Sequence, residues 1–288
     1  MHIGHSSALL RAGIRGGQRG FTLTELAIVF MLVALLVGGA VLTLSAQTEA
    51  REIADTQQTL EQAREAILGF AVRNGRLPCP AVGGSNGAES FCTNATGGCG
   101  ALIVAPPQAA PAHGRCSSPE GFVPAAALGI GPIETNPVSA AFGALVDSWL
   151  LPVGYSVTQV FSPTPPANTI RLFTATGEMR ANMLAAPPIA PDLIVCTTST
   201  GAVTGAPPAL PTCVGPGFLT PAVVYSRGKN GAAAPAGTDE IENTNGDRVF
   251  VARTPSPASP TPAAGFDDLV LWISPNILYN RLIAAGAL

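Results

Sequence analysis

The side chains that could do chemistry gather late in the chain, between Tyr225 and Asp268. They comprise Ser226-Arg227-Gly228-Lys229-Asn230-Gly231, the acidic stretch from Asp239 to Asp247, and the pair Asp267-Asp268. Carboxylate and amide oxygens crowded into loops are the hard ligands that Ca²⁺ prefers. Two plainer interpretations stay open. Asn245-Gly246 is typical of a hairpin turn, and acidic loops are commonly just solvated.

The residue types of most catalytic sites are scarce. The three histidines are His2, His5 and His113. A Ser-His-Asp triad would have to use His113, which lies in an Ala/Pro-rich segment beside Cys116. The run 129–132 (Gly-Ile-Gly-Pro) lacks the third glycine of a phosphate-binding loop, and its proline has no N–H to donate. Asp267 and Asp268 are adjacent, which on a strand would point them to opposite faces. We therefore expect no enzymatic activity.

Six cysteines lie beyond the apolar N-terminal run: Cys79, Cys92, Cys99, Cys116, Cys196 and Cys213. An even number of cysteines in an exported segment predicts up to three disulfides. A zinc site is disfavoured because the spacings contain no Cys-x-x-Cys pair and histidine ligands are missing. Many pairings are possible, and we expect Cys196 to pair with Cys213 across a Pro/Gly-rich loop.

Composition and charge narrow the class of protein. Of 288 residues, 11% are charged and 47% are hydrophobic, which excludes a charge-rich disordered chain. The 32 glycines and 27 prolines favour a loop-rich body over a helical bundle. Residues 1–20 contain three arginines and no acid, whereas residues 21–288 carry a net charge of −6. An acidic body disfavours nucleic acid as a partner.

From Phe21 to Ala46 the chain is apolar, with Glu25 as its one charge and no proline. As a helix this run would be about 39 Å long, enough to cross a hydrocarbon core of about 30 Å. The basic flank predicts a cytoplasmic N-terminus and an exported body. The run is too long for a secretory signal and lacks its cleavage site. A carboxylate inside an ordinary anchor would be unusual, because a charge there costs about 2.5–3.5 kcal/mol.

The helical pattern continues beyond this run. Ile53, Leu60 and Ile67 recur every seven residues, which is a helix period, and Asn74-Gly75 is a plausible stop. We therefore predict one helix over 22–73. Gly38-Gly39 is its weakest point. It is either a place where the helix bends or melts in a filament, or an ordinary feature of membrane helices.

Arg19-Gly20-Phe21-Thr22-Leu23-Thr24-Glu25-Leu26 resembles the cleavage and methylation motif of type IV prepilins and type II secretion pseudopilins. The resemblance implies that a prepilin peptidase cuts after Gly20 on the cytoplasmic face and that the new amine of Phe21 is N-methylated. It also implies that Glu25 neutralises the α-amine of a neighbouring subunit during assembly. The leader, residues 1–20, is longer than many in the family, although its basic, acid-free character fits.

Two segments of the body carry a partial resemblance to major pseudopilins. Asp147-Ser148-Trp149 is similar to their Asp-x-Trp-Gly turn, but the glycine expected after Trp149 is absent. The run from Ser226 is similar to their calcium loop, although it is longer and lacks the EF-hand spacing. This likeness implies calcium as a candidate cofactor, and the alternative that no cofactor binds stays open. The implied ligands are Glu242, Asp247, Asp267 and Asp268, with Asp239 a weaker candidate.

The expected fold is α+β and pilin-like, with the long N-terminal helix packed on an antiparallel β-sheet that bears loop-rich, disulfide-bearing insertions. The expected strands are 155–161, 170–174, 193–196, 223–226, 248–252 and 269–273, and a short helix is expected over 275–285. Residues 75 to about 120 are expected to be a loop region. The Pro/Ala-rich segments 105–112, 163–168, 186–191, 206–211 and 255–263 are expected to be surface loops.

The expected domains are a cleaved basic leader (1–20), a transmembrane helix half (21–46), an amphipathic helix half (47–74) and a periplasmic or extracellular globular domain (75–288). The resemblance implies a single pass through the bacterial inner membrane, and then a place in a surface or periplasmic filament. Its implied partners are the prepilin peptidase, other pilin or pseudopilin subunits, the inner-membrane assembly platform and, before assembly, membrane lipid.

The expected function is that of a structural subunit of a type IV pilus or a type II secretion pseudopilus. Size, six cysteines and extra loops favour a minor subunit. The alternative is a filament-borne or membrane-anchored binding protein, such as an adhesin or a substrate-recognition subunit.

Overall fold

The computed structural model describes residues 20, 22–95, 97–161, 170–184, 190–205, 210–233, 237–256 and 265–288, without the side chains of 39–46, 159–161, 170–172 and 182. The chain divides into two compact units, Met1–Ala50 and Arg51–Leu288, and each is described by itself. The predicted loop 163–168 and parts of 186–191, 206–211 and 255–263 lie outside the described residues.

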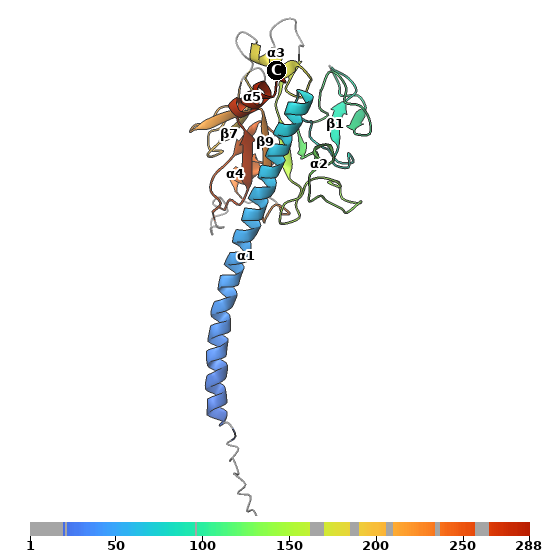
Figure 1. Cartoon of the computed structure of the whole chain (residues 1–288). Helices are drawn as coiled ribbons and strands as arrows, with labels where there is room; N and C mark the ends of the chain where they lie inside the picture. The colour runs from blue at the N-terminus through green and yellow to red at the C-terminus, as the bar shows by residue number, and fades with distance from the viewer. Residues whose placement is uncertain are drawn as a thin grey trace, which may run out of the picture. The chain divides into compact units, whose positions relative to one another are not determined.

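Helix α1 spans Leu23–Asn74, close to the predicted 22–73 (Figure 1). Its backbone stays helical through Gly38 and Gly39. It ends where Gly75 takes a φ of +64° and its N–H donates to the carbonyl of Ala71 at 2.8 Å, since glycine adopts this left-handed conformation without strain. Among the described residues, no helix combines the length and the apolar character that a membrane crossing requires. The span expected over 21–46 stays a prediction.

The second unit is built around a four-stranded antiparallel sheet in the order β11-β9-β4-β3. Its strands are β3 (Glu120–Phe122), β4 (Gly154–Val157), β9 (Ala222–Ser226) and β11 (Leu269–Ile273). Alternate residues of a strand face opposite sides, so Val224 and Val223 enter two different cores.

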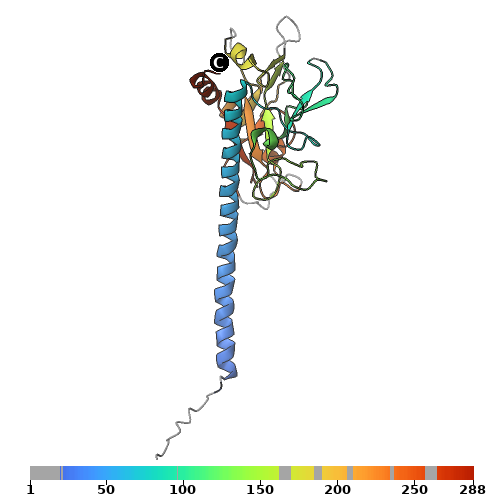
Figure 2. The same cartoon turned by 45° about the vertical axis from the view of Figure 1, so that its right-hand side comes forward.

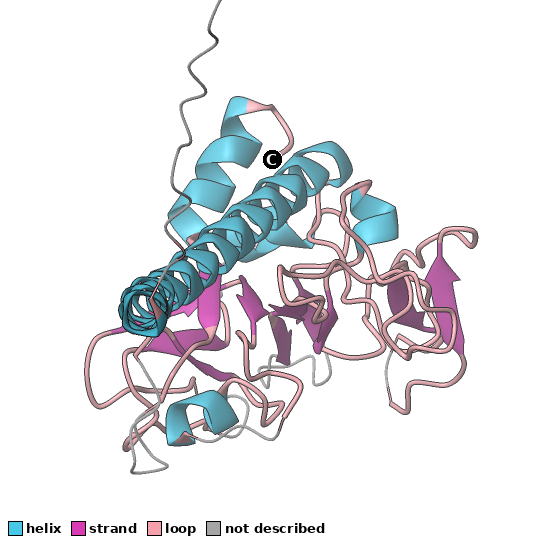
Figure 3. Ribbon diagram, turned by 90° about the horizontal axis from the view of Figure 1, so that it is seen from below, coloured by secondary structure: helices cyan, strands magenta, loops and turns pink. Residues whose placement is uncertain are grey.

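Helices cover one face of this sheet (Figures 2 and 3). The buried stripe of α1 packs with Tyr155, Val157 and Val224, and it consists of Leu60, Ala63, Ile67, Leu68 and Ala71. Helix α5 (Pro275–Ala284) begins on proline as predicted and adds Leu278 and Leu282 to the same core. This core confirms the expected packing of the N-terminal helix on an antiparallel sheet.

A second sheet, in the order β10-β7-β8, packs on the other face. Its strands are β7 (Leu193–Cys196), β8 (Gly217–Thr220) and β10 (Val249–Val251). The core between the sheets joins Val195 and Phe250 to Val223 and Tyr225. Strand β7 is antiparallel to β8 but parallel to β10. That parallel pair departs from the antiparallel expectation, because the long segment 197–248 allows the chain to cross over before it pairs again.

The remaining elements are small. The segment predicted to be loop up to about residue 120 contains the hairpin of β1 (Glu89–Cys92) and β2 (Leu102–Ala105). The predicted strand 155–161 is divided at Thr158 into β4 and β5 (Gln159–Phe161), and β5 pairs with β6 (Ile170–Leu172). The short helices α2 (Ala125–Leu128), α3 (Glu178–Leu184) and α4 (Thr238–Glu242) have no counterpart in the sequence analysis.

Candidate functional site

Helix α1 begins with a reciprocal capping box. Thr22 Oγ1 accepts the N–H of Glu25 at 3.3 Å, and Glu25 Oε2 accepts the N–H and the hydroxyl of Thr22 at 3.0 and 2.8 Å. This pairing satisfies N–H groups that a helix start leaves without partners. Gly20, the predicted cleavage position, is exposed and lies before the helix, whereas Phe21 lies outside the described residues. Glu25 is therefore held by its own chain at the helix start.

The first unit exposes apolar side chains along α1. Between 47% and 87% of the surface of each is exposed, and they are Leu23, Leu26, Ile28, Val29, Phe30, Met31, Leu32, Val33, Leu35, Leu36 and Val37. Consecutive residues of a helix point in different directions, so the run from Ile28 to Val33 covers every face. A helix that is apolar all round is typical of a segment buried by other protein or by lipid.

In the second unit, a tight turn is bonded to α1 where the sequence suggested the Asp147-Ser148-Trp149 turn. The indole N–H of Trp149 donates to Glu52 Oε2 at 3.0 Å, and the N–H of Ser148 donates to Thr56 Oγ1 at 3.3 Å. Asp147 Oδ2 accepts the hydroxyl of Ser226, on β9, at 2.6 Å. Burial raises the pKa of Asp147. The turn thus joins helix and sheet.

Three carboxylates converge beside the end of α4. One oxygen each from Glu240, Asp267 and Asp268 lies within 4.8 Å of the others. The expectation that Asp267 and Asp268 point to opposite faces is wrong, because both precede β11 rather than lie in it. Burial, followed by the charges of Glu240 and Asp267, raises the pKa of Asp268 to about 7, against a hydrogen bond from Asn243. The cluster therefore holds more negative charge than its surroundings readily accept.

The chain's own donors already occupy several oxygens of this cluster. Asn230 donates its side-chain N–H to Glu240 Oε1 at 3.1 Å and its backbone N–H to Asp267 Oδ2 at 3.0 Å. Asn243 Nδ2 donates to Asp268 Oδ2 at 2.8 Å. Among the described residues, the buried atom Asp267 Oδ1 has no hydrogen-bond partner. Hard oxygens with one unpaired carboxylate oxygen suit the ligand chemistry of Ca²⁺, with Glu240 in the set.

The other residues of the predicted calcium set lie in a separate group. Asn245 Nδ2 donates to Glu242 Oε2 at 3.2 Å and to Asp247 Oδ2 at 3.0 Å. Asp239 is bonded to Ser199 and forms an ion pair with Arg253 at 2.9 Å. The hairpin alternative for Asn245-Gly246 is wrong, because this turn connects α4 to β10, whose described partner is the parallel strand β7. Sequence reasoning missed Glu240, which no motif distinguishes from its acidic neighbours.

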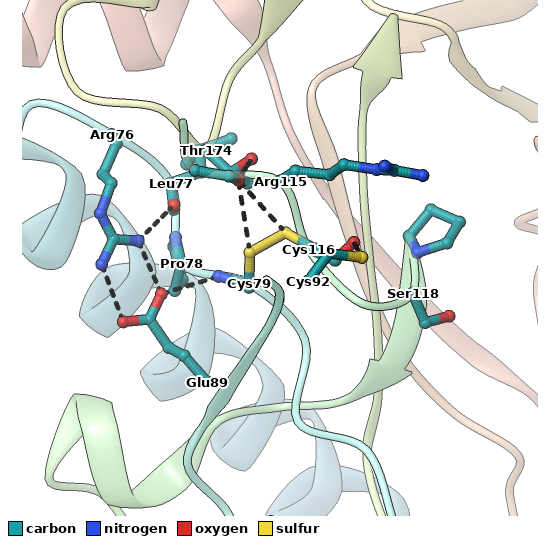
Figure 4. The surroundings of a disulfide bond; sticks show 12 residues. Arg76, Leu77, Pro78, Cys79, Glu89, Cys92, Arg115, Cys116, Ser118 and Thr174 are labelled. Carbon is teal, nitrogen blue, oxygen red and sulfur yellow. Dashed lines mark hydrogen bonds and ion pairs between the residues drawn. A yellow bond between two sulfur atoms is a disulfide. The ribbon is translucent and has the colours of Figure 1, made fainter. Parts of the chain in front are cut away.

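The six cysteines pair as Cys79–Cys116, Cys92–Cys99 and Cys196–Cys213, and the last is the pairing that the sequence suggested. Figure 4 shows the surroundings of the first. There Arg76 donates to both carboxylate oxygens of Glu89 at 2.6 and 2.9 Å, and Glu89 also accepts the N–H of Cys79 at 2.8 Å. Both partners are under 10% exposed. This buried ion pair was not predicted, since charge alone does not reveal burial.

Two adjoining cavities follow strand β3. One, of about 280 Å³, is lined by residues that include Arg115, Asp192 and Arg248, and the other, of about 510 Å³, by residues that include Tyr225 and Arg227. They share Pro119, Glu120 and Gly246. Burial and then the charge of Asp247 raise the pKa of Glu120, which accepts the hydroxyl of Tyr225 at 2.5 Å. The cavities are thus polar and of mixed charge.

Residues 15–41 match the prokaryotic N-terminal methylation motif. The chain carries the prepilin-type signature of type IV pilins and pseudopilins. The motif supports a protein of this pilin or pseudopilin family, whose members are structural rather than enzymatic, are processed by prepilin peptidases and assemble with other pilin subunits. No curated protein and no solved structure matches the chain.

Proposed function

We propose that the chain is a minor structural subunit of a type IV pilus or a type II secretion pseudopilus. The observation that carries this proposal is the prepilin-type signature at 15–41, which overlaps the start of a 52-residue helix. In this proposal the leader 1–20 is removed between Gly20 and Phe21 by the prepilin peptidase, and Phe21 is N-methylated. The helix half 21–46 rests in the inner membrane, with 75–288 outside it, until the assembly platform extracts the subunit.

The exposed surface of α1 supports this role. Its apolar side chains from Leu23 to Val37 cover every face of the helix, which is costly in water at about 25 cal/mol per Å² of apolar surface. Lipid would cover this surface before assembly, and neighbouring helices would cover it in a filament.

Glu25 has a chemical role in this scheme. A carboxylate in apolar surroundings is stabilised when a cation is placed beside it. Cleavage after Gly20 creates such a cation, the α-amine of Phe21, on every subunit. Glu25 would exchange its bonds to Thr22 for the amine of a neighbour.

Mass spectrometry of the N-terminus, in cells with and without their prepilin peptidase, tests the proposal. An N-methylated Phe21 that is present only with the peptidase is the expected result. An intact Met1 in peptidase-competent cells would contradict it, and a membrane-anchored binding protein would then be the better account.

The two cavities along β3 favour a second candidate, a filament-borne binding protein such as an adhesin or a substrate-recognition subunit. Arg115, Glu120 and Arg248 line the smaller cavity, and Glu120 also lines the larger one, so that charged side chains are available to recognise a polar ligand. The shape-conserving variant Glu120→Gln would then leave filament incorporation intact but reduce attachment or secretion of a substrate. Equal attachment and equal secretion in the variant would remove this candidate.

A further inference from the structure

The larger cavity along β3 is lined by two opposite charges that do not pair with each other. Its volume is about 510 Å³, and Glu120 and Arg227 are the charged side chains among the described residues that line it. Within the described part of the chain, no ion pair joins the two. A cavity of this size holds a small organic molecule. The space is therefore suited to a ligand that contacts both charges.

Arg227 follows strand β9 and is partly buried. Its positive charge opposes the burial that raises the pKa of Asp147 and of Asp268, yet among the described residues its guanidinium has no hydrogen-bond acceptor and no ion-pair partner. A cation drawn partly out of water without a partner is costly, and the planar fork of an arginine matches the two oxygens of a carboxylate. The cavity that Arg227 shares with Glu240 and Asp268 is only about 40 Å³, too small for an organic ligand.

Glu120 is fixed by the sheet but keeps one oxygen for a further partner. The ring of Tyr225 lies across Gly154, where an added β-carbon would come within 2.2 Å of it, and its hydroxyl donates to Glu120 Oε1 at 2.5 Å. Oε2 accepts no hydrogen bond from the described residues and lies near Gly246, whose added β-carbon would be 3.6 Å away. Glu120 Oε2 is thus available to accept a hydrogen bond from a hydroxyl or an ammonium group.

We propose that the larger cavity binds a small carboxylic acid that also carries hydroxyl or ammonium groups, with its carboxylate on Arg227 and one of its donors on Glu120. A carboxylate fits better than a phosphate monoester, whose nearly two negative charges would meet one cation beside a carboxylate. Acidic sugars and free amino acids share the proposed chemistry. The inference deepens the second candidate function and rests on it for the use that a cell makes of the site.

Isothermal titration calorimetry of the detergent-solubilised full-length chain tests the ligand class. D-galacturonate and L-glutamate are the acidic probes, and D-galactose and L-glutamine are neutral controls of similar size. At least one acid should bind about tenfold more tightly than its control, because the control lacks the charge-assisted bonds to a guanidinium. Binding of galacturonate indicates an acidic sugar, and binding of glutamate an amino acid. If neither acid binds at millimolar concentration, or if acid and control bind equally, the proposal is wrong.

Variants of Arg227 test whether the binding belongs to this cavity. Arg227→Gln should abolish measurable binding, and Arg227→Lys, which keeps the charge but loses the fork, should weaken it about tenfold. Arg180→Gln, at an exposed position of α3, is the matched control and should bind like the native chain. Melting temperatures are measured alongside. If Arg227→Gln fails to fold, Arg227→Lys decides, and unchanged affinity in the folded variants would overturn the site.

Processing and filament incorporation are measured separately, so that the two proposals fail independently. Arg227→Lys should be cleaved after Gly20 and enter filaments like the native chain, while its binding of the acidic probe falls. A native chain that enters filaments but binds neither acid would overturn this inference and leave the structural role standing. A native chain that binds an acid but keeps Met1 in peptidase-competent cells would overturn the structural role and leave the site standing.

Discussion

The two ends of helix α1 share one continuous backbone but have opposite surfaces. Residues 23–38 expose apolar side chains on every face, whereas residues 51–74 bury one stripe and leave Glu, Gln, Asp and Arg outside. The buried stripe has its partners within its own chain, in Tyr155 and Val224. The difference teaches that the later half is stabilised by its own fold, whereas the earlier half leaves its apolar side chains exposed among the described residues.

Carboxylates differ between the two regions in the same way. Glu25 is exposed and bonded to the capping residue Thr22. Asp147 and Asp268 are buried; Asp147 accepts hydrogen bonds from Trp149, Leu151 and Ser226, and Asp268 accepts one from Asn243, all within their own unit. The buried carboxylates are thus held by the fold of the second unit, whereas, among the described residues, the exposed Glu25 is held only by the nearby Thr22.

The largest expected effect comes from Glu25→Ala. Filament incorporation should be lost or strongly slowed, because no carboxylate then meets the amine of a neighbouring Phe21, while insertion into the membrane should persist. Glu61→Ala, which removes a half-exposed carboxylate from the later half, is the matched control. Fractionation and filament shearing measure both steps, and normal incorporation of Glu25→Ala would show that the two ends do not differ in this respect.

Truncating an apolar side chain to alanine should lower the free energy of unfolding in the later half of α1 but hardly change it in the earlier half. Ile67→Ala removes a fully buried side chain and should cost about 2–5 kcal/mol through lost burial and a cavity. Leu35→Ala, at a position 69% exposed, should stay within about 0.5 kcal/mol. Urea unfolding of the detergent-solubilised full chain measures both. Equal costs at the two positions would break the comparison.

The buried carboxylates predict a pH dependence. Asp268 has a folded pKa of about 7 and an ordinary value of 3.8, so the fold favours its protonated form. The resulting stability is complete below about pH 4 and is lost as pH rises through 7, a change on the order of 4 kcal/mol. Asp268→Asn should remove this slope in chelator-treated protein, although the neighbouring Glu240, Asp267 and Arg227 remain. Parallel pH profiles for the two proteins would contradict the assignment.

The same variant tests calcium. If the cluster of Glu240, Asp267 and Asp268 holds Ca²⁺, millimolar calcium should raise the melting temperature of the native protein by several degrees, since a ligand that binds only the folded state stabilises it. Asp268→Asn should respond much less. Glu242→Gln, outside the cluster, should respond like the native protein. If calcium raised the melting temperature of all three proteins equally, this cluster would not be a calcium site.

The smallest expected effect lies at the junction of α1 with the turn. Thr56→Val removes the acceptor of the Ser148 N–H at a fully buried position and should cost about 1–2 kcal/mol. Thr59→Val loses only a bond to the carbonyl of Asp55 on its own helix and should be nearly neutral. Thermal unfolding of the two variants side by side provides the measurement. If Thr59→Val lowers the stability as much as Thr56→Val does, the hydrogen bond between Thr56 and Ser148 contributes no stability of its own.

The sequence predicts most where one physical signal dominates. The seven-residue recurrence of Ile53, Leu60 and Ile67 marked the packed half of α1 because helix geometry alone sets that period. The apolar, β-branched runs at 193–196 and 269–273 are strands β7 and β11 with the predicted bounds. The helix start at Pro275 was also predicted correctly.

Prediction from the sequence fails where contacts with residues far away in the chain determine the local structure. Strand β1 starts at Glu89, a charged residue that lies buried with Arg76 and the N–H of Cys79 bonded to its carboxylate, and these partners lie outside the strand. Glu240 joins Asp267 and Asp268 because α4 folds back toward the start of β11. Each depends on contacts that spacing along the chain does not encode.

The indole of Trp149 offers a built-in optical reporter. The chain has two tryptophans, and the other, Trp272, stacks on Phe218 at 5.9 Å between ring centres. In Trp272→Phe the remaining emission would come from Trp149, next to the carboxylate of Glu52. The wavelength of its emission maximum would then report whether α1 is packed on the body. Quenching of the same emission by a neighbouring subunit would report association.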